Sequence, residues 1–117
     1  MRRWLRIWRE PDTQTVKSYL EMFKDLYLLT DLEGWEPPLR AKSRVRTKPK
    51  RYFVDPSLPA AVLGAAPNTL MRDTQTLGDL FETLCIRDLN VYLSAMPGAG
   101  NRIAYYRDDK GLEVDVI

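Results

Sequence analysis

The sequence predicts an α+β fold, with one long helix in each half of the chain and short strands in the middle and at the end. Two amphipathic patterns of helical period, at residues 13–26 and 78–94, predict the helices. Short apolar runs predict strands at residues 27–32, 52–54, 103–107 and 112–117. With 117 residues, 44% of them apolar and 29% charged, the chain is long enough for one compact domain or for two small subdomains that share a core.

The first nine residues are basic and amphipathic. Trp4, Leu5 and Trp8 fall on one helical face, while the arginines of residues 2–9 fall mostly elsewhere. A helix of this composition can lie on a membrane surface. We favour the alternative of a short helix packed on the domain and ended by Pro11.

Residues 13–26 give the clearest helical pattern. The apolar positions follow the i, i+3, i+4, i+7 spacing: Val16, Tyr19, Leu20, Phe23 and Leu26. Asp12 or Thr13 can cap the helix, and Lys17 and Lys24 face outward. The apolar run 27–32 then reads as a strand that enters a turn at Gly34.

Positive charge is concentrated in one segment. Seven of the twelve residues at positions 40–51 are basic, none is acidic, and six of the seven recur at every second position: Arg40, Lys42, Arg44, Arg46, Lys48, Lys50 and Arg51. On an extended chain this spacing places the basic side chains along one edge. Such a basic arm suits a phosphate backbone. It suits equally a solvated loop that keeps an edge strand from aggregating, and both interpretations stay open.

Capping residues, helix-breaking residues and apolar spacing predict the remaining helices and the last hairpin. Asp55 is expected to cap a short Ala-rich helix that Gly64 ends. The longest helix should begin near Gly78 and end before Pro97, with an inward apolar stripe: Leu80, Phe81, Leu84, Cys85, Leu89 and Tyr92. Cys85 in that stripe is expected to be inert packing. The two last strands should form a hairpin through residues 108–111.

Composition excludes several classes of function. The chain has no histidine and one cysteine, which removes His-based catalysis and the usual four-ligand zinc sites. No glycine-rich phosphate loop is present, so we expect no nucleotide hydrolysis by this chain alone. A lone cysteine fits the reducing cytoplasm. The least charged stretch, 56–71, contains helix breakers, and the N-terminus lacks the apolar region of a secretory signal, so we expect no membrane span.

An acidic group lies near the end of the chain. If the final strand turns Leu112, Val114 and Val116 inward, then Glu113 and Asp115 share the opposite face. Two carboxylates on one strand face can hold a divalent metal. Glu82 would add a third oxygen ligand if the long helix packs on the hairpin. The alternative, a solvated strand face, stays open.

Several motifs in order resemble a known family. They are TVKSYL at 15–20, RYFVDPSL at 51–58, LGDLFE at 77–82 with RDL at 87–89, YYRD at 105–108 and GLEVD at 111–115. In order and spacing they resemble the uncharacterised C-terminal domain of prokaryotic AAA+ ATPases over residues 13–117.

The resemblance implies a fold and a set of residues. It implies a winged-helix-like segment at 13–55, whose helix from Thr15 takes the recognition position and whose basic arm lies near the wing. It implies at 56–117 a core like that of PD-(D/E)XK restriction endonucleases. Residues 1–12, outside the resemblance, are expected to form a helical extension ahead of the winged-helix-like segment. Glu82 and Asp115 would then occupy acidic positions of the nuclease-like site, on the first core helix and the second core strand.

The sequence departs from the family pattern at both ends. The ATPase module is absent, and the chain stops at Ile117, before the strand on which the family commonly carries E-x-K. Phosphodiester cleavage would therefore lack one metal ligand and the group that positions water. We expect Glu82 and Asp115 to be vestigial, and Mg²⁺ to bind only if another chain completes the truncated site.

These observations lead to one expected function and two alternatives. The first is a fragment of an AAA+ ATPase-associated protein that binds nucleic acid non-specifically through Lys17, Lys24 and the basic arm. The second is a protein-interaction or oligomerisation module that uses the open edge of strand 112–117, including contact with a second copy. The third is a nuclease assembled in trans. None of them involves a membrane.

Overall fold

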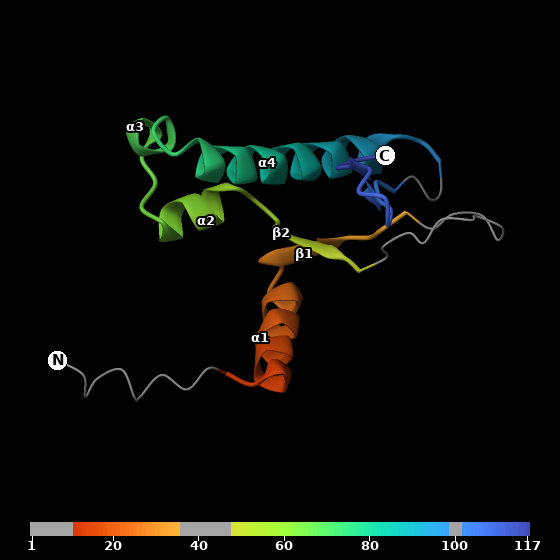
Figure 1. The fold of residues 1–117 in the computed structure, drawn as a ribbon, viewed down its shortest axis with the longest axis horizontal. Coiled ribbons are helices and arrows are strands. Elements are labelled where there is room, and N and C mark those ends of the chain that lie inside the picture. The colour runs from red at the N-terminus through yellow and green to blue at the C-terminus, as the bar shows by residue number, and fades with distance from the viewer. Residues whose placement is uncertain (1–10, 36–47, 99–101) are drawn as a thin grey trace.

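The computed structural model describes residues 11–35, 48–98 and 102–117. Its elements, in chain order, are α1 (Thr13–Asp25), β1 (Leu29–Leu32), β2 (Lys50–Phe53), α2 (Ser57–Val62), α3 (Pro67–Leu70), α4 (Thr74–Ala95), β3 (Tyr106–Arg107) and β4 (Glu113–Val114) (Figure 1). The predicted α+β class is confirmed. The expected helix at 2–9 and most of the basic arm, Arg40, Lys42, Arg44 and Arg46, lie outside the described residues.

Helix α1 begins and ends where its local chemistry requires. The Asp12 side chain accepts a 2.7 Å hydrogen bond from the Thr15 amide and caps the first turn. At the other end Tyr27 adopts a left-handed φ of 57°, and the Leu28 amide bonds back to the Phe23 carbonyl at 2.9 Å. This is the Schellman arrangement that ends many helices. Tyr27 therefore belongs to the helix cap, and the strand predicted from residue 27 starts at Leu29.

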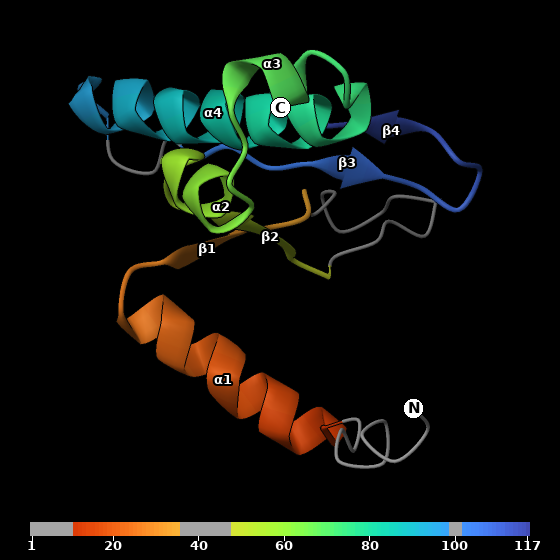
Figure 2. The ribbon, with the colours of Figure 1, turned by 90° about the vertical axis from the view of Figure 1, so that its left-hand side faces the viewer.

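The strands form two antiparallel pairs that meet at one point. In the first pair Leu29 lies opposite Phe53 and Leu32 opposite Lys50. A parallel bridge between Gly34 and Tyr105 joins this pair to the C-terminal strands. Helices α1 and α4 lie on opposite sides of these strands, and α1 projects away from the rest of the molecule (Figure 2).

Two short helices connect β2 to α4. The Asp55 side chain accepts from the Ser57 amide at 2.8 Å as α2 begins, and Gly64, at a φ of 60°, follows its end. The one-turn helix α3 was not predicted, because four residues around Pro67 carry no periodic pattern.

Helix α4 begins four residues earlier than predicted. The Asp73 side chain accepts from the Thr76 amide at 3.1 Å and from its hydroxyl at 2.7 Å, and this cap outweighs the helix-weakening Gly78. The helix then runs for 22 residues. None of the helices in the described ranges has the length and apolar character to cross a membrane.

The core is small and draws on three parts of the chain. Leu32 of β1, Ile86 of α4 and Tyr105, just before β3, are buried, and Tyr52, Ile103 and Val116 pack against them. The predicted inward stripe of α4 is wrong for Phe81, Leu89 and Tyr92, since Phe81 is 62% and Tyr92 is 65% exposed. Its other members, Leu80, Leu84 and Cys85, are half-buried. The buried positions of α4 are Thr83 and Ile86 on the other side of the helix.

The C-terminal hairpin carries an extra residue in its second strand. Tyr106 lies opposite Val114, whereas Ala104 exchanges two backbone hydrogen bonds with Ile117, so the register shifts by one residue between the two pairs. Val116 reaches the core, but Leu112 and Val114 are exposed. The predicted alternation, with all three inward, is therefore correct only for Val116.

Candidate functional site

A group of polar side chains surrounds β2 on the side of α4. The Tyr52 hydroxyl donates a 2.5 Å hydrogen bond to Glu82. The Lys50 ammonium, two residues away on the same strand, lies 3.0 Å from Glu113 and 3.3 Å from Asp115. We call these five residues the β2 polar cluster. It places Glu82 and Asp115, the two acidic residues singled out in the sequence, beside neighbouring positions of one strand.

Electrostatics fix the protonation of this cluster. Burial raises the pKa of the Tyr52 hydroxyl, and the hydrogen bond to Glu82 and the charges of Asp115 and Glu113 raise it further. Burial on its own lowers the pKa of Lys50, but its hydrogen bonds to Glu113 and Asp115 outweigh burial and the pKa is raised. Tyr52 is therefore a neutral donor and Lys50 a cation at neutral pH.

The contacts within the cluster connect β2 to α4 and to β4. The Lys50 ammonium contacts the carboxylates of Asp115 and Glu113. The Tyr52 hydroxyl donates to the carboxylate of Glu82, so both donors come from β2. Within residues 11–35, 48–98 and 102–117, no three Cys, Asp or Glu side chains are grouped so that they could hold a metal ion.

Three of the basic residues singled out in the sequence, Lys24, Lys50 and Arg51, are paired with acids in the described residues. Lys24 lies 2.7 Å from Asp31 of β1, and Arg51 lies 3.5 Å from the same carboxylate. Lys50 is held in the β2 polar cluster. Lys17 and Lys48 are exposed, and the Lys48 carbonyl accepts a hydrogen bond from the Tyr105 hydroxyl.

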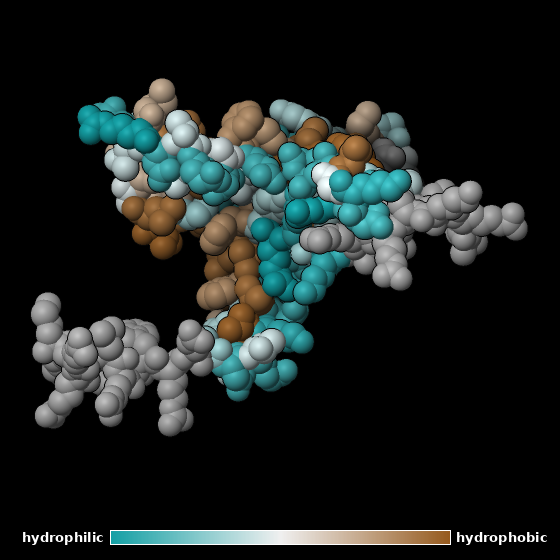
Figure 3. Space-filling model, in the orientation of Figure 1, coloured by the Kyte–Doolittle hydropathy of each residue, from teal (hydrophilic) through white to brown (hydrophobic). Residues whose placement is uncertain are grey.

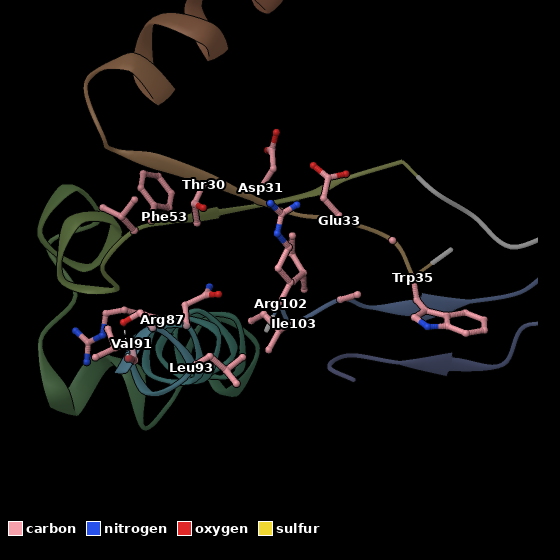
Figure 4. A pocket seen from close by; sticks show the side chains of 16 residues that line it. Thr30, Asp31, Glu33, Trp35, Phe53, Arg87, Val91, Leu93, Arg102 and Ile103 are labelled. Carbon is pink, nitrogen blue, oxygen red and sulfur yellow. Dashed lines mark hydrogen bonds between the residues drawn. The ribbon is translucent and has the colours of Figure 1, made fainter. Parts of the chain in front are cut away.

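A pocket of about 840 Å³ lies between β1 and the C-terminal half of α4 (Figure 4). Its charged lining residues are Asp31 and Glu33 on the β1 side, Arg87 on α4 and Arg102 in the segment before β3. Arg87 is already engaged, at 2.6 Å from Asp55 and 2.9 Å from Asp88. The ion pair with Asp55 fixes the segment after β2 against α4. The hydrogen bonds from Ser57, together with this ion pair, hold the pKa of Asp55 at about 2.

A second hollow is an apolar groove between α1 and α2. It has a volume of about 590 Å³, and apart from Arg51 its lining is apolar or aromatic: Leu20, Phe23, Leu28, Leu29, Tyr52, Phe53, Leu58 and Val62. We call it the α1–α2 groove. Figure 3 shows a hydrophobic surface along the side of α1 that faces α2 and a hydrophilic one on its opposite side. No residue of α1 is buried.

Sequence reasoning did not find this groove. The apolar spacing of residues 16–26 was visible, but the pattern alone predicts a helix whose apolar side packs on the domain. The structure instead anchors α1 by its polar side, through the ion pair of Lys24 with Asp31, and by its C-terminal cap.

The open strand edge expected at residues 112–117 is short. Only Glu113 and Val114 form β4, and Ile117 returns to bond with Ala104. The exposed Leu112 and Val114 flank that edge.

Comparison with known proteins gives one relationship. Residues 7–69, which make up more than half of the 117-residue chain, match the family model described as Domain of unknown function (DUF8612). No curated protein and no solved structure matches the chain.

Proposed function

We propose that this chain, which belongs to the DUF8612 family, is a protein-interaction module whose α1–α2 groove receives an apolar helical face of a partner. The observation that carries the proposal is the exposed apolar side of α1. Val16, Tyr19 and Leu26 are exposed, although a helix of this pattern normally buries such residues.

The shape of the groove favours a helix as the occupant. Its walls are two helices and its floor is formed by Leu29 and Phe53, which lie opposite each other on β1 and β2. Grooves lined by aliphatic and aromatic side chains bind amphipathic helices through anchors at i, i+3, i+4 and i+7. Exposed apolar patches of this kind mark protein contacts in soluble proteins.

The energetics of α1 point the same way. Isolated helices shorter than about 12–15 residues are marginal in water, and α1 has 13 residues. The ion pair of Lys24 with Asp31 and the Schellman hydrogen bonds at its C-terminal end join it to β1. A partner in the groove would supply the apolar burial that α1 lacks.

Photo-crosslinking tests this function. Benzoylphenylalanine replaces Phe53, which lines the groove, and in a matched variant replaces Phe81, which is exposed on α4. We expect a discrete covalent adduct from position 53 in cells and none from position 81. The absence of an adduct from position 53 would contradict the proposal. We place the module in the cytoplasm, where the single Cys85 stays reduced.

Non-specific nucleic-acid binding is the second candidate. Its specific support is the alternating basic arm of residues 40–51, together with the exposed Lys17. Fluorescence anisotropy of a labelled duplex at several salt concentrations tests it, beside a variant in which Lys42, Arg44 and Arg46 are alanine. Phosphate binding predicts a log–log salt slope that shrinks by up to about 0.9 for each phosphate ion pair that the variant cannot form. No binding at low salt would exclude it.

We also propose the finer fold that the family resemblance implies. The order of α1 and then the β1–β2 pair fits the helix and wing of a winged helix, and α4 followed by the C-terminal hairpin fits the acidic half of a nuclease-like core. Glu82 and Asp115 would be vestigial there. Incubating supercoiled plasmid with the chain and Mg²⁺ or Mn²⁺ should leave it intact, and cleavage that Asp115→Ala abolishes would refute this assignment.

A further inference from the structure

We infer that the occupant of the α1–α2 groove is a second copy of the chain, and that across a two-fold axis each copy inserts the exposed side of its α1 into the groove of the other. The inference rests on the proposed function and names its partner. It starts from the observation that α1 is at once a wall of the groove and an amphipathic helix none of whose residues is buried.

The apolar residues of α1 fall into two groups, one that lines the groove and one that points away from it. Leu20 and Phe23 line the groove. Because successive residues turn by about 100° around a helix, Tyr19, Met22 and Leu26 point roughly a quarter turn away from them. Tyr19 is 56% and Leu26 is 59% exposed. We call Tyr19, Met22 and Leu26 the α1 ridge.

A ridge beside a groove of the same chemistry is self-complementary. In a two-fold contact the same patch serves both copies, so each ridge fills the groove of the other copy. Val62, which lines the far wall of the groove at the end of α2, is exposed, and so is the next residue, Leu63. Both can therefore contact an inserted ridge. The contact closes at two copies.

The charges of α1 permit this approach. The helix carries two lysines, Lys17 and Lys24, and two acids, Glu21 and Asp25, so it has no net charge. Two copies of α1 therefore meet without net repulsion. A strongly basic or acidic helix in the same place would oppose self-association.

A rival contact exists on α4, and symmetry argues against it. The exposed Phe81 and Tyr92 form a second apolar surface on the outer side of α4. If this surface filled the groove of another copy head to tail, the contact would be heterologous and would give a ring or an open chain, whereas closed two-fold dimers are the commonest assemblies. The mutual insertion of α1 gives a closed dimer.

Sedimentation equilibrium with matched tyrosine variants tests the inference. The chain should dimerise as its concentration rises, Tyr19→Asp should raise the dimer dissociation constant at least about tenfold, and Tyr92→Asp should leave it unchanged. Leu26→Asp repeats the test at the other end of the ridge. Circular dichroism confirms that each variant keeps its helices.

Site-directed crosslinking tests the geometry. In a Cys85→Ser background, a Leu26→Cys chain is mixed with a Val62→Cys chain and oxidised. The mutual insertion predicts a mixed disulfide dimer, and a pair of Tyr92→Cys and Val62→Cys chains should give none. A chain that stays monomeric, or a dimer that Tyr19→Asp preserves or Tyr92→Asp dissolves, overturns the inference.

The outcomes separate this inference from the function it rests on. A monomeric chain whose benzoylphenylalanine adduct from position 53 contains a different protein overturns the second copy as occupant and keeps the interaction module. A monomeric chain with no adduct overturns both.

Discussion

The Tyr52 hydroxyl and the Glu82 carboxylate share a 2.5 Å hydrogen bond that joins β2 to the middle of α4. Two residues before Tyr52, Lys50 contacts Glu113 of β4 and Asp115 just after it. One side of a four-residue strand thus holds the long helix and the C-terminal hairpin together. With only three apolar residues buried in the described chain, these polar ties carry much of the architecture.

Replacing Tyr52 by phenylalanine should destabilise the fold by about 1–3 kcal/mol, because it leaves the part-buried Glu82 carboxylate without its donor. Urea denaturation measures the loss. Tyr92→Phe is the matched control, since Tyr92 is exposed on α4 and lies outside the proposed α1 contact, and its midpoint should not move. Equal midpoints for Tyr52→Phe and the wild type would show that the bond adds nothing to stability.

Ile86→Ala should cost about 2–5 kcal/mol, because Ile86 is 1% exposed and lies at the centre of the core. Leu89→Ala, on the side of α4 that the apolar stripe marks, should cost far less. Chemical denaturation of the two variants decides which side of α4 faces the strands. A larger loss for Leu89→Ala would mean that the helix is rotated.

Stability should fall as the pH is lowered from about 4 to about 2. The pKa of Asp55 is about 2 in the folded chain against an ordinary 3.8, because Ser57 and Arg87 stabilise its carboxylate. Such a group stabilises the fold above its unfolded pKa and loses that contribution as pH falls through its folded pKa. Thermal unfolding should show a shallower pH dependence in this range for Asp55→Asn. An identical pH profile in both proteins would refute the assignment.

Tyr27→Gly should stabilise the chain by about 1 kcal/mol, because Tyr27 holds a left-handed φ of 57° that costs a non-glycine residue energy. The exposed ring loses no packing in the change. Tyr27→Ala keeps the strained backbone and should bring no such gain. Comparing the two thermal midpoints checks this, and a gain of the same size in Tyr27→Ala would assign it to removal of the ring.

Local chemistry made much of the fold predictable. Asp12 and the spacing of residues 16–26 gave α1, and the turn at residues 108–111 gave the hairpin, since caps and turns are decided by a few neighbouring residues. The start of α4 was missed because Gly78 looked like a boundary, whereas the side chain of Asp73 bonds to Thr76 and starts the helix four residues earlier.

The burial of α4 could not be read from its own sequence. Its most apolar stripe stays outside because the opposite side carries Glu82 and Arg87, whose partners Tyr52 and Asp55 lie on or next to β2. The paired residues are about thirty positions apart in the sequence, so the periodic pattern within the helix carries no information about them. The α1–α2 groove was hidden for the same reason, because its floor and second wall come from β1, β2 and α2.

Hydrogen exchange of α1 tests the central claim most directly, namely that its apolar side waits for a partner. In the dilute chain the amides of Leu20–Lys24 should exchange much faster than those of Thr83–Arg87 in α4. When a partner occupies the groove, through higher concentration or photo-capture at position 53, the α1 amides should slow while those of α4 stay the same. Protection of α1 equal to that of α4 in the dilute chain would contradict the account, because α1 would then be stabilised without a partner.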